Sequence, residues 1–363
     1  MDDPGLNTPV HGSNLGHGGK PAGERLEQPL LLARRPEEDA RLVHGRVIVV
    51  RGRTRQTGLM ETFRTPDERF ADLPDFPWQP SYAEVADGDG GTLRMAYVDA
   101  GPAGGPVALL LHGEPSWSFL YRHVIAGLTG AGVRCVALDL VGFGRSDKPL
   151  ATGDHTFARH VEWVRALAFD HLDLREVTLV GQDWGGLIGL RLVAEHPDRF
   201  VRVVAANTGL PTGDFDMPEI WWMFHDAVAK AEVLDIGRLV AAGCARGMSD
   251  EVRAAYDAPF PTEQSKAGPR AMPTLVPTRP DDPATPANRR AWAALGEWDR
   301  PFLTAFSDSD PITGGMETIL QRHVPGAHGL GHPTIANAGH FLQEDAGDAL
   351  GSVVARFMSA PSG

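Results

Sequence analysis

The segment GQDWGG (181–186) constrains the fold of this chain more than any other stretch. It follows the apolar run VTLV and precedes LIGLRLVAEH, so the three parts predict a strand, a sharp turn and a helix. Glycines two positions either side of a central residue allow such a turn to be strained and to project the central side chain. Here the central residue is Asp183, so the turn is expected to present a carboxylate.

Other apolar runs of strand length lie on both sides of this segment. VALLLHG (107–113), CVALDLVGFG (135–144) and VRVVAANTG (201–209) are continuous, which is typical of strands buried on both faces of a parallel sheet. Residues 155–172 carry apolar side chains three or four positions apart, which predicts an amphipathic helix. Strands that alternate with helices of this length predict βαβ units and an α/β fold with a mainly parallel sheet.

The first 59 residues differ from the rest in composition. They are rich in Gly, Pro, Arg and Glu, and only RVIVV (46–50) resembles a strand. Such a segment buries too little apolar surface to offset its loss of conformational entropy. We therefore expect residues 1–59 to be a disordered extension, and METFRTPDERF, from Met60, resembles an ordinary protein start.

The alternation of predicted strands and helices along the chain is interrupted once. Residues 211–297 contain helix-like patches, several prolines and a tryptophan pair, but no run typical of a buried strand. Strand-like runs then resume at PFLTAFSDSD (301–310). We expect residues 60–210 and 298–363 to form the α/β core, and residues 211–297 to form a helical cap over the carboxyl ends of its strands.

Composition excludes several classes of function. The formal net charge is −13 and no block of lysine and arginine stands out, so nucleic-acid binding is not expected. The two cysteines, Cys135 and Cys244, have no spacing typical of a disulfide framework or metal site, which favours a reducing compartment. No apolar run reaches the roughly 18 residues of a membrane helix, and the N-terminus lacks a signal-peptide pattern. We expect a cytoplasmic protein without a membrane partner or a metal.

Asp183 is the candidate nucleophile. An aspartate is already ionised at neutral pH and needs no base to activate it, and the N-terminus of the following helix favours the anion. It could displace a leaving group from carbon and form an ester with the enzyme. The alternative, an aspartate that only caps the helix, does not account for the glycines at 181, 185 and 186.

His340, in NAGH just after a strand-like run, is the candidate base. Hydrolysis of an ester needs a water molecule activated at its carbonyl, and a neutral imidazole is suited to that role. The order nucleophile, acid, histidine along the chain is that of α/β hydrolases. The acid should come from FSDSDPIT, where Asp310 is preferred and Asp308 stays open, because either could hold the imidazole tautomer. The alternative for either is a plain turn aspartate before Pro311.

A candidate oxyanion hole comes from backbone alone. HGEP (112–115) follows the strand-like VALLL, and in α/β hydrolases the N–H after that strand and the N–H after the nucleophile bind the oxyanion. These would be the N–H groups of Glu114 and Trp184. A simple turn at this position is compatible with the same role.

Five segments together resemble the haloalkane dehalogenases, in the subfamily typified by the Xanthobacter dichloroethane enzyme. They are HGEPSWSFLYR (112–122), DLVGFGRSDKP (139–149), VGQDWGGLIGL (180–190), YDAPFP (256–261) and AGHFLQED (338–345). The resemblance runs from about residue 60 to the C-terminus. It implies an α/β-hydrolase fold with a mainly parallel eight-stranded sheet, helices on both faces and an inserted helical cap. It also implies hydrolysis of a haloalkane to an alcohol, halide and a proton, without a cofactor.

The same resemblance assigns roles to the site residues. It implies SN2 attack by Asp183, an alkyl-enzyme ester, and hydrolysis by water that His340 activates. Trp184 would donate its indole N–H to the halide, and a cap tryptophan would be the second donor. MPEIWWMF (217–224) offers Trp221 and Trp222, and family segments of the form E-x-W-x-x-F match at Trp221. Core packing is the alternative for each tryptophan. The implied partners are a small halogenated alkane, water and the halide product, and we expect a monomer.

Three other functions compete with this interpretation. An epoxide hydrolase would need two cap tyrosines, and only Tyr256 lies in the expected cap. A fluoroacetate dehalogenase would need an arginine beside the nucleophile, where Trp184 stands. A catalytically inactive α/β hydrolase that binds ligands would not need the whole set of catalytic residue types, which this chain retains.

Overall fold

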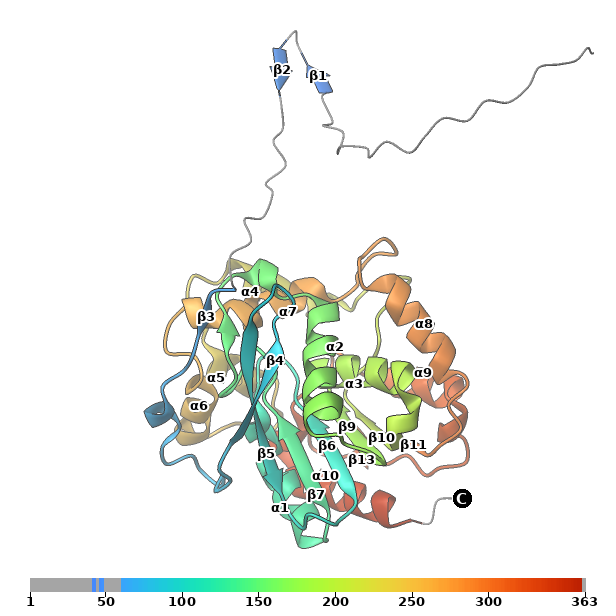
Figure 1. Cartoon of the computed structure of the whole chain (residues 1–363). Helices are drawn as coiled ribbons and strands as arrows, with labels where there is room; N and C mark the ends of the chain where they lie inside the picture. Colours follow the sequence, from blue (N-terminus) through green and yellow to red (C-terminus); the bar gives the residue numbers. More distant parts are fainter. Residues whose placement is uncertain (1–40, 44–45, 49–59, 361–363) are drawn as a thin grey trace, which may run out of the picture. The chain divides into compact units, whose positions relative to one another are not determined.

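The computed structural model describes residues 41–43, 46–48 and 60–360 of the chain. Most of the predicted disordered extension therefore lies outside the described residues. Within residues 1–56, which form a unit of their own, β1 (Arg41–Val43) and β2 (Arg46–Ile48) pair as an antiparallel ladder (Figure 1). The strand expected at RVIVV is confirmed for its first three residues.

A sheet of seven strands runs through the described residues 60–360 (Figure 1). In order across the sheet, the strands are β11 (Phe302–Thr304), β10 (Phe200–Ala206), β9 (Val177–Gln182), β6 (Val107–Leu111), β7 (Arg134–Leu138), β5 (Thr92–Ala100) and β4 (Ser81–Ala86). The first five pair in parallel, whereas β5 is antiparallel to both β7 and β4. The prediction of a mainly parallel sheet is confirmed.

The expected count of eight strands is wrong for the main sheet of the described residues. After β11 the chain continues as β12 (Phe306–Ser307), which pairs in parallel with β13 (Thr334–Ile335) in a separate ladder. Two local features keep β13 short. Pro333 precedes it and lacks an N–H donor, and Asn337 turns the chain with a φ of 57°. A further two-stranded ladder joins β3 (Thr62–Phe63) to β8 (Lys148–Pro149).

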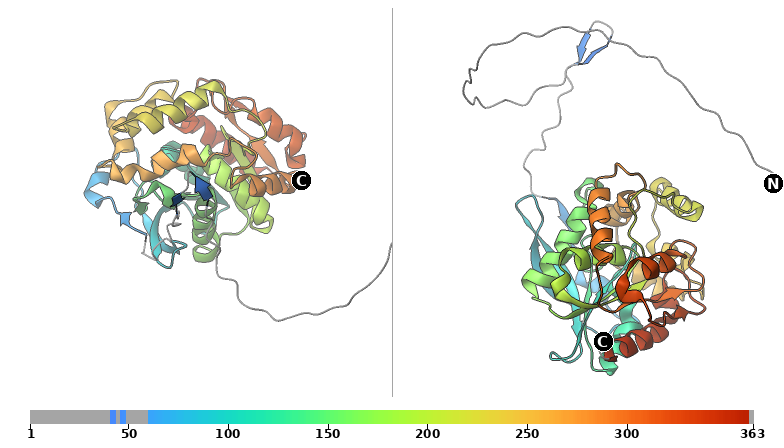
Figure 2. Two further views of the ribbon diagram at one scale, coloured as in Figure 1. Left: turned by 90° about the horizontal axis from the view of Figure 1, so that it is seen from above. Right: turned by 90° about the vertical axis from the view of Figure 1, so that its right-hand side faces the viewer.

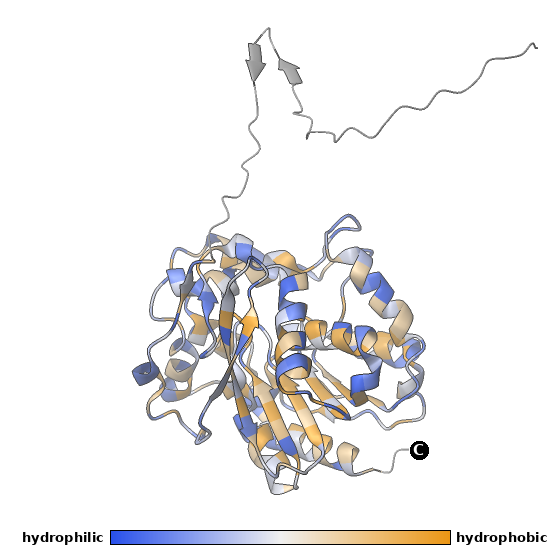
Figure 3. Cartoon of the chain, viewed as in Figure 1, coloured by the Kyte–Doolittle hydropathy of each residue, from blue (hydrophilic) through white to orange (hydrophobic). Residues whose placement is uncertain are grey.

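Each face of the main sheet carries its own hydrophobic core. Successive side chains of a strand point to opposite faces, so Leu109 and Leu111 of β6 lie in one core while Ala108 and Leu110 lie in the other. Figure 3 shows the apolar character of the central strands. The helices that contribute to the first core include α2 (Phe157–Arg165), α3 (Trp184–Glu195), α8 (Thr285–Leu295) and α9 (Met316–His323). The second core is covered by α1 (Arg122–Gly130) and α10 (Leu342–Ser359).

The amphipathic helix expected at 155–172 is confirmed. It begins as α2, where the Oγ1 atom of Thr156 accepts a hydrogen bond from the N–H of Arg159 at 3.1 Å and caps the N-terminus. It continues as a π-helical stretch over Ala166–His171. Helices therefore lie on both faces of the sheet, as expected.

Residues 211–297, between β10 and β11, form helices and no strand (Figure 2). Ahead of α8, these helices are α4 (Glu219–Lys230), α5 (Ile236–Ala242), α6 (Asp250–Asp257) and α7 (Ala267–Leu275). We call residues 211–297 the helical insert. Its last helix, α8, packs along α3 of the core, and the expected domain boundaries at 211 and 297 stay predictions. Of the helices in the described part of the chain, none is long and apolar enough to cross a membrane.

Candidate active site

Asp183 lies at the sharp turn between β9 and α3, as expected from GQDWGG. Its backbone has a φ of 49° and a ψ of −125°, a region that side-chain-bearing residues rarely adopt. The neighbouring glycines are required by space. A Cβ on Gly185 would lie 2.0 Å from the carbonyl oxygen of Leu111, and one on Gly186 would lie 2.1 Å from Oγ1 of Thr208. The close packing of β6, β9 and α3 therefore fixes the nucleophile turn.

The loop after β6 holds one oxygen of this carboxylate. The N–H of Glu114 donates a hydrogen bond of 2.8 Å to Oδ1 of Asp183. Gly113 permits the approach, because a Cβ there would lie 2.4 Å from Cβ of Asp183. His112 braces the loop: its Nδ1 is 2.9 Å from the carbonyl oxygen of Gly113, and its Nε2 is 3.0 Å from the N–H nitrogen of Leu140. One of the two expected oxyanion donors thus contacts Asp183, and the role of the Trp184 N–H stays a prediction.

The structure brings Asp183, His340 and Asp310 together from three separate loops. Nδ1 of His340 is 3.1 Å from each carboxylate oxygen of Asp310. Nε2 of the same ring is 3.5 Å from Oδ2 of Asp183. Asp308 does not contact the ring; it is exposed and accepts hydrogen bonds from the N–H groups of Asn337 and Ala338 at 2.8 and 3.2 Å. The geometry therefore favours Asp310 over Asp308 as the partner of the histidine.

The two aspartates shift the pKa of His340, and His340 in turn shifts the pKa of Asp310. Burial alone would lower the pKa of His340, but the carboxylates of Asp310 and Asp183 outweigh it and raise the pKa to about 10. Burial would raise the pKa of Asp310, but the His340 ring, the Thr313 hydroxyl and the Ile312 N–H lower it below its ordinary value. The imidazole is therefore readily protonated while both carboxylates are ionised.

A second contact concerns the other ring nitrogen of His340. Nε2 of Gln182, the residue before the nucleophile, lies 3.3 Å from Nε2 of His340 and 3.1 Å from its carbonyl oxygen. When the ring is neutral, with its proton on Nδ1 toward Asp310, its Nε2 lone pair can accept from this amide. Gln182 is thus placed to favour the tautomer that a base needs. The sequence analysis did not identify this residue.

Asp345 holds the loop that carries His340. Its buried carboxylate accepts three backbone N–H groups, from Gly339 at 2.8 Å, Ala245 at 2.7 Å and Arg246 at 2.9 Å. Gly339 belongs to the histidine loop, and the other two follow α5 in the helical insert. The N–H of His340 also donates to the carbonyl oxygen of Gly243 at 2.8 Å. Asp345 thus ties the histidine loop to the insert, although the sequence offered only its place in AGHFLQED as a signal.

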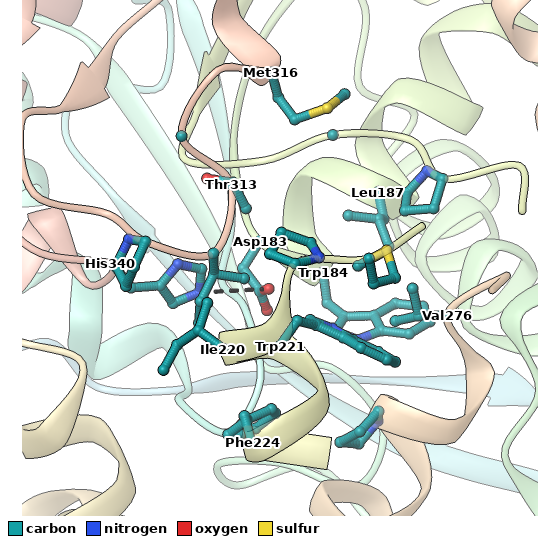
Figure 4. A pocket seen from close by; sticks show the side chains of 18 of the residues that line it. Asp183, Trp184, Leu187, Ile220, Trp221, Phe224, Val276, Thr313, Met316 and His340 are labelled. Atoms are coloured by element: carbon teal, nitrogen blue, oxygen red, sulfur yellow. Dashed lines mark ion pairs between the residues drawn. The ribbon is translucent and has the colours of Figure 1, made fainter. Parts of the chain in front are cut away.

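A cavity of about 1170 Å³ opens above the nucleophile, between the core and the helical insert (Figure 4). Trp184 and Trp221 both line it and are nearly buried, with 3% and 5% of their surface exposed. Trp222 is 41% exposed and is not among the lining residues. Trp292 lines the cavity as well, but its indole N–H donates to the carbonyl oxygen of Leu210, whereas no described residue accepts from the indole N–H of Trp184 or of Trp221. Both are therefore free to bind a ligand in the cavity, and the expected choice of Trp221 over Trp222 agrees with this placement.

The side chain of Glu114 also lines the cavity and is almost fully buried. Within the described part of the chain, its Oε1 atom has no hydrogen-bond partner. Burial, together with the negative charge of Asp183, raises its pKa well above the ordinary value. A carboxyl group in these surroundings favours its neutral form.

No tyrosine lines the cavity in the described residues. Tyr256, from the helical insert, instead donates a hydrogen bond of 2.6 Å to Oε2 of Glu344. The pair of tyrosines that an epoxide hydrolase would need is therefore missing from the cavity wall.

Comparisons with known proteins agree with this geometry. A family model of the alpha/beta hydrolase fold matches residues 106–242. A haloalkane dehalogenase from Psychrobacter cryohalolentis is 50% identical over 299 residues, which cover 82% of this chain and 98% of that relative. One from Mycobacterium marinum is 51% identical over 291 residues, covering 80% and 97%. A solved tetrameric haloalkane dehalogenase from Paraglaciecola agarilytica superposes with a TM-score of 0.76 at 36% identity, covering 83% of this chain and 100% of that one.

Proposed function

The chain belongs to the haloalkane dehalogenase family, whose members hydrolyse a haloalkane to an alcohol and a halide ion, and on that premise we propose that Asp183, His340 and Asp310 carry out this reaction here. Asp183 is the nucleophile, His340 the base that activates water, and Asp310 the acid that orients His340. The reactants are a haloalkane and water, and the products are an alcohol, halide and a proton.

The first step is displacement of the halide. Oδ1 of Asp183 is held by the N–H of Glu114, so Oδ2 is the oxygen left to attack the substrate carbon. A carbon–oxygen bond forms, and the electron pair of the carbon–halogen bond leaves with the halide. The indole N–H groups of Trp184 and Trp221 would bind the departing ion and offset part of its loss of hydration.

The second step is hydrolysis of the resulting ester. Alkylation removes the charge of Asp183, one of the two carboxylates that raise the pKa of His340. Loss of that charge lowers the pKa of the ring and favours its neutral form, which is the form that can take a proton from water. His340 takes a proton from water, which attacks Cγ of Asp183. The N–H groups of Glu114 and Trp184 would stabilise the oxyanion on Oδ1, and the alcohol leaves with the oxygen that was Oδ2.

The helical insert is proposed to act as the cap of this site, because it supplies Trp221 and the residues that hold the histidine loop. We propose that residues 1–59 are dispensable, so that a chain starting at Met60 turns over haloalkanes like the full chain. We also propose a monomer, which light scattering after size-exclusion chromatography tests against the tetramer described for one relative. Both cysteines are unpaired, which supports a reducing compartment such as the cytoplasm.

One observation carries the assignment of roles: His340 bridges Asp183 and Asp310 at the floor of a cavity whose lining includes Trp184 and Trp221. The experiment is halide release from 1,2-dibromoethane by the full chain and by Asp183→Asn. Release that disappears in the variant supports the roles. Release near the wild-type rate, with asparagine verified by mass spectrometry, would overturn them.

A further inference from the structure

The cavity is much larger than a two-carbon haloalkane requires. Pockets that enclose drug-sized ligands measure about 300–1,000 Å³, and this one measures about 1170 Å³. Resting on the dehalogenation proposed above, we propose that the site selects long-chain, uncharged haloalkanes such as 1-bromooctane, and disfavours haloalkanes that end in a carboxylate.

The cavity has a reactive end and an apolar rim. Asp183 and His340 lie at the reactive end, near Trp221 of α4 (Figure 4). The rim residues are exposed apolar side chains from the loop before α4, from α4 itself and from α9. They are Phe215, Ile220, Met223 and Ile319, which are 86%, 38%, 62% and 49% exposed.

These four side chains are most of the exposed large hydrophobic side chains in the described part of the chain. Six large hydrophobic side chains of the described residues are exposed, and four of the six line this one cavity. Exposed apolar side chains gathered at one place mark a binding surface for an apolar ligand. The remaining two, Trp222 and Val233, lie outside the lining.

Apolar side chains also form the wall between the rim and the nucleophile. Leu187, Phe224, Val276 and Met316 are prominent among them (Figure 4). An alkyl chain attached to the reacting carbon would therefore exchange water for apolar contacts along this wall. Each methylene buried in this way is expected to raise kcat/KM about fourfold, until the chain reaches the rim.

The charges of the wall oppose an anionic substrate. Among the described residues that line the cavity, Arg289 is the single lysine or arginine. Both its Nε and Nη2 atoms donate to the carboxylate of Asp214, so its charge is already paired. Asp216 adds a further negative charge at the same part of the wall. A substrate carboxylate would find no unpaired cation among these side chains.

A substrate series tests the proposal with the full chain. Halide release is measured for 1,2-dibromoethane, 1-bromobutane, 1-bromohexane and 1-bromooctane, and for 6-bromohexanoate as the charged counterpart of 1-bromohexane. We expect kcat/KM to rise by up to about 250-fold from the butyl to the octyl compound, because four further methylenes contribute about fourfold each, and we expect 6-bromohexanoate to be at least about tenfold poorer than 1-bromohexane.

The outcomes separate this proposal from the function on which it rests. A kcat/KM that is flat or falls with chain length, while 1,2-dibromoethane is turned over, would overturn the proposed substrate class alone. Equal turnover of 6-bromohexanoate and 1-bromohexane would overturn the proposed selection against substrates that carry a carboxylate. Absence of halide release from every compound would overturn the proposed function itself.

A matched pair of variants tests the rim directly. Met223→Asp places a charge at the rim, and Val233→Asp places the same charge at a side chain that is 72% exposed and outside the cavity. The octyl-to-butyl ratio of kcat/KM should fall about fivefold or more in Met223→Asp and stay at the wild-type value in Val233→Asp. An unchanged ratio in Met223→Asp, with unchanged circular dichroism, would contradict binding of the chain at the rim.

Discussion

The N–H of Glu114 and Oδ1 of Asp183 are joined by a hydrogen bond of 2.8 Å, which gives the two oxygens of the nucleophile different surroundings. Oδ2 faces the other way, 3.5 Å from Nε2 of His340. In the proposed mechanism, Oδ1 becomes the carbonyl oxygen of the ester and Oδ2 attacks. The side chain of Glu114 lies in the same wall of the cavity, so one residue supplies both a backbone donor and a buried carboxyl group.

Glu114→Gln is expected to stabilise the protein more at pH 8 than at pH 5. The folded-state pKa of Glu114 is raised well above its ordinary value, so the folded chain holds a proton that the unfolded chain releases above about pH 4.5. The stability that this group contributes therefore falls as pH rises between the two values. Glutamine has no such proton to lose. Urea unfolding at both pH values measures the difference, and an equal effect of the substitution at pH 5 and pH 8 would contradict a raised pKa.

Asp345→Asn is expected to slow ester hydrolysis more than halide displacement. The substitution weakens the carboxylate contacts that hold Gly339, Ala245 and Arg246, and hence the loop that carries His340. In the proposed mechanism His340 acts only in the second step, so kcat should fall about tenfold while the initial burst of halide is retained. Unfolding stability should fall by roughly 1–3 kcal/mol. Rapid-quench halide measurements separate the two steps.

Asp348→Asn is the control for this variant, because Asp348 is exposed on the same helix, α10. It should leave both the burst and kcat unchanged. If Asp345→Asn lowers the burst and kcat to the same extent, Asp345 supports the fold in general and does not position the base.

The buried pair His155 and His160 is expected to destabilise the protein in acid. Their rings are stacked, with Nδ1 of His155 3.1 Å from Nε2 of His160. Burial is the main cause that lowers the pKa of His155 to about 4. The unfolded chain therefore binds a proton below about pH 6.5 that the folded chain refuses until about pH 4, and stability is lost as pH falls through this range, by up to about 3 kcal/mol.

Chemical unfolding at pH 7 and pH 5 measures this loss. His155→Gln should lose less stability between these values than the wild-type chain. His328→Gln, at an exposed histidine, should lose as much as the wild type. An equal loss of stability in all three proteins would mean that the buried histidine pair does not cause the destabilisation at acidic pH.

Trp221→Phe and Trp222→Phe should differ in halide binding. Adjacent helical residues point about 100° apart, and of the two only Trp221 lines the cavity. Removing its indole N–H leaves the halide one donor fewer, so turnover should fall about tenfold, and quenching of protein fluorescence by bromide should weaken. Trp222→Phe should keep turnover within about twofold. The opposite pattern would move the halide site by one residue.

The sequence predicted those parts of the fold that local patterns encode. The continuous apolar runs predicted the parallel strands, and the glycines around Asp183 predicted its turn, because both depend on residues close together in the chain. The eighth strand was expected from a family resemblance and not from a local pattern, and Pro333 and Asn337 explain why β13 is only two residues long.

The contacts that hold the site residues in place could not be predicted from local sequence patterns. Asp345 meets Ala245 across a hundred residues of sequence, and Gln182 meets His340 across 158. A carboxylate that binds three backbone N–H groups has no periodicity that marks it. The burial of the Glu114 side chain likewise depends on tertiary packing, which one sequence read locally does not determine.

The most direct test of the central claim is mass spectrometry of the His340→Gln variant after brief exposure to a bromoalkane. Glutamine cannot act as the base, whereas Asp183 keeps its oxygens and the N–H of Glu114. Displacement should therefore proceed and hydrolysis should stop, which leaves the alkyl group on the enzyme. The account predicts an alkyl ester on the peptide that contains Asp183, with one halide released per enzyme molecule. An unmodified Asp183 after substrate binding has been demonstrated, or an alkyl group on another residue, would contradict it.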